Sequence, residues 1–220
     1  MTSSSSKSEP NICVSVAPKT ITEAATLLAE ADSSSANYIE LRVDALRDDP
    51  TPLKSLLEGL DKPLVLTYPD DSTLSLGAKI SPNKLRELMV YAEYVDTGVE
   101  PPEGLAVKRI GSKHVWSSVT MGEGEKLVNE ISKSGCEIVK LAFKAQSFAD
   151  NITALKLTSK LRVRNIVLCM GELGVFSRVL APLYGSAWTY ACLRPGLETA
   201  PGQLDVNTLR ELYQTLRWPA

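Results

Sequence analysis

The sequence predicts a single α/β domain with the architecture of a compact (β/α)8 TIM barrel. Eight short apolar segments alternate with helical segments along the chain. Most of these apolar segments do not alternate with polar residues, which is typical of parallel strands covered on both faces. The chain has 220 residues, enough for one such barrel. An open doubly wound sheet is the alternative, but no GxGxxG motif follows the first expected strand.

The expected strands are short apolar and β-branched runs, at residues 12–17, 38–43, 63–68, 94–97, 114–119, 137–142, 165–169 and 187–192. The expected helices carry apolar residues three and four positions apart. They lie at residues 20–31, 52–60, from 81 onward, 123–134, 149–161, 175–183 and 205–216. Thr20 opens a Thr-x-x-Glu capping box, and Ser81-Pro82 places proline in the first turn of a helix. Residues 100–113 have room only for a short helix or turn.

Composition excludes several classes of function. The net charge of −2 gives no basic field for nucleic acid or an anionic membrane, and no apolar run reaches the ~18 residues that span a bilayer. Residues 1–10 are rich in serine and lack an apolar segment, which predicts a flexible tail, not a signal peptide, before a barrel domain at 11–220. The four cysteines lack CxxC spacing, so we expect free thiols in a reducing cytoplasm, with neither a disulfide framework nor a metal site.

Lys140 is the most informative residue, because it interrupts the apolar run Glu137-Ile138-Val139-Lys140-Leu141-Ala142. Lysine is rarely buried without a reason. Burial lowers the pKa of an ammonium group, and the neutral amine that results can attack a carbonyl carbon. The alternative is a lysine that extends to solvent at a strand end or pairs with a carboxylate. The run therefore makes Lys140 a candidate nucleophile.

In a barrel, functional residues gather at the carboxyl ends of the strands. This rule selects Ser15, Glu40, Arg42, Tyr68 and Lys140, and the loops at residues 171–178 and 198–203. Arg178, after a glycine-containing turn at a helix start, is suited to a carboxylate or phosphate. Without the barrel, an ordinary surface or ion-paired arginine is the better interpretation of Arg178.

Together these residues resemble the type I 3-dehydroquinate dehydratases, the Schiff-base dehydratases of the shikimate pathway. The likeness lies in Glu40-Leu41-Arg42-Val43-Asp44, Ile138-Val139-Lys140, Met170-Gly171 through Gly174 to Ser177-Arg178, Tyr184-Gly185-Ser186-Ala187-x-Thr189, and Ala200-Pro201-Gly202-Gln203. Each motif alone is weak, but their order and spacing hold from about residue 12 to the end of the chain. The resemblance implies a barrel, the substrate 3-dehydroquinate, no metal or organic cofactor, and in some members a homodimer.

The resemblance also implies roles for individual residues. Lys140 matches the lysine that forms an imine with the substrate ketone, which permits loss of a proton from the adjacent carbon and then loss of water. Residues that match substrate contacts are Ser15, Glu40, Arg42, Arg178, Thr199 and Gln203. Arg178 is the natural bidentate partner of the carboxylate, and Thr199 keeps a hydroxyl where the family usually has serine.

The first departure from the family pattern concerns the histidine that acts as its general acid and base. Aligning residues 114–119 with the family's fifth strand places Val119 at that position. The single histidine, His114, then begins the strand, some 16 Å away at ~3.3 Å per residue. The site is thus expected to lack the histidine, although a shift of register would restore His114.

The second departure is on the third strand, where Pro69 stands in place of an arginine. In addition, Gly98 stands where the family tends to have glutamate. Candidate replacements for proton transfer are Tyr68, Ser118, Thr120 and Glu40, and Lys79 is a candidate for the arginine. Three hypotheses follow: a working 3-dehydroquinate dehydratase, a Schiff-base lyase or aldolase acting on another keto acid or keto sugar, and a non-catalytic member. The intact Lys140 favours the first.

Overall fold

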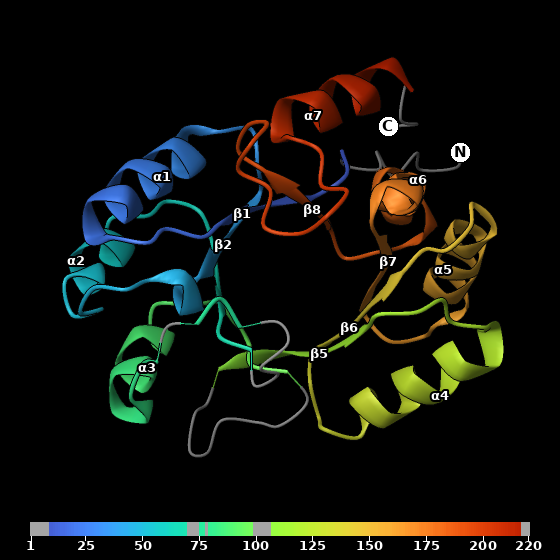
Figure 1. The fold of residues 1–220 in the computed structure, drawn as a ribbon, viewed down its shortest axis with the longest axis horizontal. Coiled ribbons are helices and arrows are strands. Elements are labelled where there is room, and N and C mark those ends of the chain that lie inside the picture. The colour runs from blue at the N-terminus through green and yellow to red at the C-terminus, as the bar shows by residue number, and fades with distance from the viewer. Residues whose placement is uncertain (1–8, 70–74, 78, 99–106, 217–220) are drawn as a thin grey trace, which may run out of the picture.

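The computed structural model of the protein describes residues 9–69, 75–77, 79–98 and 107–216. In these residues eight parallel strands form one sheet, ordered β7-β6-β5-β4-β3-β2-β1-β8. The sheet curves into a nearly closed barrel with the helices on its outside (Figure 1). At the seam between β7 and β8, the N–H of Ala187 donates to the carbonyl of Asn165 (2.9 Å). The predicted (β/α)8 barrel is confirmed.

The strands are β1 (Ile12–Val16), β2 (Tyr38–Arg42), β3 (Leu64–Thr67), β4 (Tyr94–Asp96), β5 (Lys108–Val115), β6 (Ile138–Lys144), β7 (Asn165–Met170) and β8 (Thr189–Cys192). The helices are α1 (Ile21–Ser33), α2 (Leu53–Glu58), α3 (Pro82–Met89), α4 (Met121–Ser132), α5 (Ala149–Lys160), α6 (Val175–Leu180) and α7 (Val206–Thr215). Three short 3-10 helices complete the described elements: η1 (Val43–Ala45), η2 (Glu172–Gly174) and η3 (Ala181–Tyr184).

The helix starts follow from local side-chain caps. The Thr20 side chain accepts a hydrogen bond from the N–H of Glu23, and Ser81 caps α3 ahead of Pro82. The Thr20 cap and a helix opening at Ser81-Pro82 were both predicted from the sequence. Thr120 and Glu123 form a full capping box that fixes the start of α4. Because each cap satisfies N–H groups that a helix start leaves unpaired, it also fixes where the preceding strand-to-helix loop ends.

Aromatic side chains fill the barrel interior toward the amino ends of the strands. The Trp188 ring stacks on Tyr38 (4.7 Å between centroids) and meets Tyr94 edge-on (5.5 Å). These rings belong to an apolar cluster that also includes Ile110, Ile138 and Ile166. Separate clusters lie between the strands and the surrounding helices. The aromatic plug closes one end of the barrel, so a ligand has room only at the other end, where the strands terminate.

The fifth strand differs from the prediction of residues 114–119. β5 runs from Lys108 to Val115, so His114 lies near its carboxyl end and not at its start. Val119 comes after the strand, buried in the cluster that packs α4 and α5 on the barrel. The prediction was wrong because β5 carries charged side chains on its outer face, and only every second residue faces the interior. Such a strand lacks the continuous apolar run that marks its neighbours.

The cysteines are all free thiols, as expected, and three of the four are fully buried. The predicted N-terminal tail at residues 1–10 lies almost wholly outside the described residues, which begin at residue 9. No helix in the described part of the chain is long and apolar enough to cross a membrane.

Candidate active site

A pocket of about 230 Å³ opens at the carboxyl ends of the strands. It is lined by Glu40, Arg42, Thr67, Pro69, Leu76, Asp96, Ser112, His114, Trp116, Lys140, Ala142, Leu168, Met170, Arg178, Tyr190, Thr199, Ala200, Pro201 and Gln203. Of the residues singled out from the sequence, it brings together Glu40, Arg42, Lys140, Arg178, Thr199 and Gln203. Its volume is below the range typical of pockets for drug-sized ligands, which points to a small substrate.

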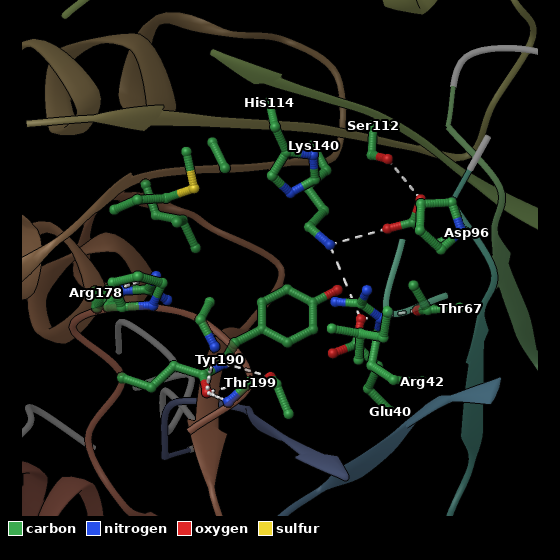
Figure 2. Close-up of a pocket in the computed structure, with 18 of the residues that line it drawn as sticks. Glu40, Arg42, Thr67, Asp96, Ser112, His114, Lys140, Arg178, Tyr190 and Thr199 are labelled. Atoms are coloured by element: carbon green, nitrogen blue, oxygen red, sulfur yellow. Dashed lines mark hydrogen bonds and ion pairs between the residues drawn. The ribbon is translucent and has the colours of Figure 1, made fainter. Parts of the chain in front are cut away.

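Lys140 reaches the pocket from the middle of β6 and is 7% exposed. Its Nζ donates to Asp96 Oδ2 (2.9 Å) and lies 3.9 Å from Glu40 Oε1 (Figure 2). Burial acts to lower the Lys140 pKa, but the two carboxylates outweigh it and the net pKa is raised. The prediction of a lowered pKa was therefore wrong. The sequence showed the apolar strand, whereas the carboxylates arrive from other strands.

Asp96 is a site residue that sequence reasoning missed. It ends β4, is 2% exposed, and its Oδ1 accepts hydrogen bonds from Ser112 Oγ (2.5 Å) and from the N–H of Gly98 (3.3 Å). Burial acts to raise the Asp96 pKa, but the Lys140 charge and the hydrogen bonds from Ser112 and Lys140 lower it overall. An aspartate at the end of a short apolar strand was the signal that could have identified it.

Glu40 lies beside this pair on β2. Its Oε1 accepts a hydrogen bond from Thr67 Oγ1 (2.8 Å), and its Oε2 accepts one from Ser15 Oγ. Ser15 is buried behind Glu40 and lines the adjacent cavity, so it orients the carboxylate and does not itself face the pocket. The predicted substrate contact at Ser15 stays a prediction, and the structure gives the residue this supporting position.

Arg42 continues the same inward face of β2. Its guanidinium forms a bidentate ion pair with Asp44 (2.9 and 2.8 Å), which holds the Arg42 pKa above its usual value against the opposing effect of burial. Asp44 also accepts a hydrogen bond from the N–H of Leu76 (2.8 Å), a residue that lines the pocket. Arg42 is thus held in place by a carboxylate that also anchors the pocket wall.

His114 lies beside Lys140 in the pocket (Figure 2). On β5, Ser112 is the register partner of Lys140 and His114 is the partner of Ala142 on β6. Because Ile110, Ser112 and His114 are two residues apart, all three point into the barrel. The expectation that His114 lies at the opposite end of the barrel was wrong. The alignment that placed Val119 at the position of the family's histidine depended on that expectation and is no longer supported.

Arg178 occupies the other side of the pocket (Figure 2). It is 2% exposed, and burial lowers its pKa to about 10. Its Nη2 donates to the carbonyl of Pro201 (3.2 Å), whereas its Nε is buried with no hydrogen-bond partner among the described residues. No acidic side chain in the described ranges forms an ion pair with it. A buried guanidinium of this kind is suited to an anionic ligand group.

Local hydrogen bonds fix the position of Arg178. Ser177, the preceding residue on α6, accepts a hydrogen bond from the N–H of Cys169 and donates to the carbonyl of Gly174 (both 2.8 Å). Its own N–H donates to Asn151 Oδ1 (2.8 Å) on α5. These hydrogen bonds hold the start of α6 against β7 and α5. They fix the orientation of the helix, so that the Arg178 side chain points into the pocket.

The loop after β8 forms the rest of this side. Gln203 Oε1 accepts from the N–H groups of Thr199 (2.8 Å) and Ala200 (3.3 Å), and its Nε2 donates to Thr199 Oγ1 (3.1 Å). Gly202 has φ +80°, and a Cβ there would lie 2.4 Å from the carbonyl oxygen of Gly171. Only glycine permits this approach, which brings the loop after β8 into contact with the loop after β7, next to Arg178.

Of the proposed replacement groups, Glu40 lines the pocket, whereas Tyr68, Ser118 and Thr120 do not. Ser118 Oγ donates to Gln146, and Thr120 caps α4. Lys79 is exposed and lines a different surface pocket, so it does not substitute for the arginine missing at Pro69. Among the residues that the structure describes, no group of three or more His, Cys, Asp or Glu side chains could hold a metal ion.

Comparison with known proteins identifies the family. The family model described as Type I 3-dehydroquinase matches residues 12–218 of the chain. The chain belongs to the type I 3-dehydroquinase family. This confirms the resemblance drawn from the motifs of Lys140 and Arg178, and the match spans the whole barrel.

Individual relatives agree with this assignment. The 3-dehydroquinate dehydratase of Methanothermobacter thermautotrophicus is 28% identical, over 93% of this chain and 96% of that protein. A bifunctional 3-dehydroquinate dehydratase/shikimate dehydrogenase of Arabidopsis thaliana is 29% identical over 94% of this chain, which corresponds to 37% of its own length. The dehydratase structure from Aquifex aeolicus has a TM-score of 0.76 at 25% identity, covering 93% and 98% of the two chains. The structure from Clostridium difficile reaches 0.81 at 23% identity, covering 96% and 94%.

Proposed function

We propose that this type I 3-dehydroquinase family member is a 3-dehydroquinate dehydratase, a hydro-lyase that forms 3-dehydroshikimate and water through an imine at Lys140. One observation carries the proposal: the buried lysine shares a small pocket with a buried arginine that has no carboxylate partner among the described residues. The substrate has a ketone for the first group and a carboxylate for the second. No metal or organic cofactor is required, because the protonated imine itself is the electron sink.

The distribution of charge supports this substrate orientation. On one side of the pocket the Lys140 charge is compensated by Asp96, with Glu40 a second carboxylate 3.9 Å from Nζ. Across the pocket the Arg178 charge remains available, and the substrate carboxylate would neutralise it with charge-assisted hydrogen bonds. Thr199 and Gln203 line the Arg178 side, and Glu40 and Arg42 line the Lys140 side. We propose these four as further contacts to substrate oxygens.

The protonation states assign roles in imine formation. Lys140 carries a raised pKa and so must lose a proton before Nζ attacks the ketone carbon. Asp96 is the carboxylate that accepts its hydrogen bond at 2.9 Å, and we assign it the role of first proton acceptor. The ketone oxygen then leaves as water with the proton returned by Asp96 and a second proton from Nζ, and the nitrogen keeps one proton and the positive charge of the protonated imine.

His114 is the group we assign to the elimination. It removes a proton from the carbon next to the imine and returns it to the hydroxyl that leaves as water, which is general base followed by general acid catalysis. Its place beside Lys140, on the inward face of β5, supports this role. The reason for proposing a non-catalytic member was the absent histidine, so that hypothesis loses its support. A different keto acid substrate retains one motive, Pro69 in the pocket wall.

We further propose that the protein is a homodimer located in the cytoplasm. A homodimer is supported by an exposed aromatic pair, Phe148 just before α5 and Phe176 on α6, whose rings meet edge-on 5.7 Å apart. Analytical ultracentrifugation of the parent and of Phe176→Asp decides this: a dimer that the substitution dissociates supports it, and a monomeric parent refutes it. The free cysteines are consistent with a cytoplasmic enzyme.

The decisive experiment is borohydride trapping. The protein is mixed with 3-dehydroquinate, reduced with borohydride and digested, and the masses of the resulting peptides are measured by mass spectrometry. We expect a reduced adduct on Lys140 in the parent, and we expect turnover and adduct both to vanish in Lys140→Ala, a loss of at least about 10⁴-fold. Lys144→Ala is the matched control, since Lys144 is exposed at the end of the same strand. Turnover that survives in Lys140→Ala would refute the imine mechanism, and an unreactive parent would refute the substrate.

A further inference from the structure

Tyr190 is a pocket residue that neither the sequence motifs nor the family resemblance assigned. It lies in the middle of β8 and is 4% exposed. The face of its ring is turned to Lys140, whose Nζ lies 4.6 Å from the ring centroid. Figure 2 shows the ring in the pocket between Lys140 and Thr199. Because the electron-rich face of an aromatic ring attracts cations, this contact favours positive charge at Nζ.

The hydroxyl group of Tyr190 does not account for its position. Oη is buried and, apart from a weak interaction with the Trp188 side chain, has no hydrogen-bond partner among the described residues. Burial, and after it the negative charge of Glu40, raises the pKa of the phenol well above its usual value, so Tyr190 is a neutral ring at working pH. The interaction between Tyr190 and Lys140 is therefore made by the face of the aromatic ring and not by the hydroxyl group.

The same nitrogen carries positive charge twice in the proposed reaction. A ketone and the Lys140 ammonium combine to give a protonated imine and one water, so the charge stays on Nζ while the C=O bond is replaced by C=N. The protonated imine activates the neighbouring C–H bond, and a neutral imine does so poorly. Whatever keeps the proton on this nitrogen extends the pH range over which the enzyme works.

We propose that the ring face of Tyr190 stabilises the positive charge that the Lys140 nitrogen carries, first as ammonium and then as protonated imine. This inference rests on the proposed imine mechanism and adds a residue to it. The ring acts from β8, whereas Glu40 lies on β2 and Asp96 on β4. The other charged or titratable groups around Nζ are Asp96, Glu40, Arg42, His114 and Cys13. A desolvated contact of this type corresponds to about a 3- to 30-fold change in a protonation equilibrium.

The test changes the ring electronics at constant shape. Position 190 is filled with phenylalanine and then with phenylalanines carrying one, two and three fluorines, which withdraw electron density from the ring face. Two quantities are measured: the alkaline limb of the kcat profile with 3-dehydroquinate, and the pKa of Lys140 in the free protein by heteronuclear NMR. The Lys140 resonance is assigned by its loss in Lys140→Met. The same fluorinated series at Tyr38, which stacks on Trp188 in the aromatic plug, is the matched control.

We expect the alkaline limb and the Lys140 pKa to move to lower pH step by step with fluorination at position 190, by about 0.5 to 1.5 across the series, and to stay fixed at position 38. Phenylalanine itself should behave like tyrosine. Values that do not follow fluorine content would overturn the inference, even in an enzyme with full turnover. If the parent protein does not turn over 3-dehydroquinate, the proposed function fails, and the NMR series still decides whether the ring stabilises the Lys140 charge.

Discussion

The two sides of the pocket treat buried charge differently. On the side formed by β2, β4 and β6, Lys140 lies between Asp96 and Glu40, and its positive charge is compensated before any ligand arrives. On the side formed by the β7 and β8 loops, Arg178 is also buried and has only a backbone carbonyl as a hydrogen-bond acceptor among the described residues. The effect on the cations is opposite: the Lys140 pKa is raised and the Arg178 pKa is lowered.

This difference separates chemistry from binding. A compensated lysine is held in a fixed place with a carboxylate ready to take its proton, which suits bond formation. A buried arginine without a carboxylate partner carries an unfavourable desolvation cost. An anionic substrate offsets this cost when it binds, so such an arginine is suited to substrate recognition. Substitutions on each side of the pocket test this division.

His114→Ala tests the chemical side most strongly. We expect kcat to fall by about 10² to 10⁴-fold, because proton transfer loses its acid and base, whereas the borohydride adduct on Lys140 should still form with the mass of undehydrated substrate. The chain has a single histidine, so diethyl pyrocarbonate should inactivate the parent with one modified histidine per chain. An unchanged kcat would remove His114 from the mechanism, and loss of the adduct would move its role to imine formation.

Asp96→Asn should destabilise the fold. It removes one partner of a buried ion pair, so we expect the free energy of unfolding to drop by about 3 kcal/mol, the low end of the usual range because Glu40 remains 3.9 Å from Nζ. The Lys140 pKa should also fall. Urea unfolding measures the first effect. Asp49→Asn is the control, since Asp49 pairs with Lys84 on the surface and should contribute little.

The pH dependence of this pair has a definite sign. The Asp96 pKa is lowered in the fold, so its contribution to stability is present above the unfolded value of about 4 and is lost as pH falls through the folded pKa. The Lys140 pKa is raised, so its contribution is present below about 10.4 and is lost as pH rises through the folded value. The stability difference between parent and Asp96→Asn should therefore be flat near neutrality and shrink below about pH 4.

Arg178→Met tests the binding side. We expect kcat/KM for 3-dehydroquinate to fall, mainly through a higher KM, because a buried partner of the carboxylate is lost. The fall corresponds to a loss of about 2–5 kcal/mol of transition-state stabilisation. The free energy of unfolding should not fall, because an uncompensated buried charge is exchanged for an apolar chain. Arg194→Met, at a largely exposed arginine after β8, is the matched control. A clear loss of stability in Arg178→Met would mean that the two sides do not differ as described.

Tyr190→Phe gives the smallest expected effect. It removes a buried hydroxyl that, apart from a weak interaction with the Trp188 side chain, has no hydrogen-bond partner among the described residues, so we expect the free energy of unfolding to rise by about 1 kcal/mol. Tyr213→Phe is the informative counterpart, because Tyr213 Oη donates to the carbonyl of Val179 (3.1 Å) and its loss should be destabilising by about the same amount. Equal stability changes in the two variants would show that the Tyr190 hydroxyl is satisfied in solution.

The sequence by itself determined the barrel and two anchors of the site. Apolar runs and helix caps act over a few residues, so the order of elements could be read locally, and the helix starts at Thr20 and Ser81 are where their caps predict. Lys140 was identifiable as a charge inside an apolar strand, and Arg178 as an arginine at a helix start. The substrate contacts inferred from the family resemblance stay predictions.

Tertiary structure alone decided what surrounds those anchors. In β5 only every second residue faces the barrel interior, so the strand does not appear in the sequence as a continuous apolar run. Its extent and the position of His114 therefore became clear only from its register with β6. Asp96 and Tyr190 lie 44 and 50 positions from Lys140 in the chain yet contact its amine. The direction of the Lys140 pKa shift follows from these contacts, because the field at a buried group is the sum of charges on other strands, and strand pairing is not a local property of the chain.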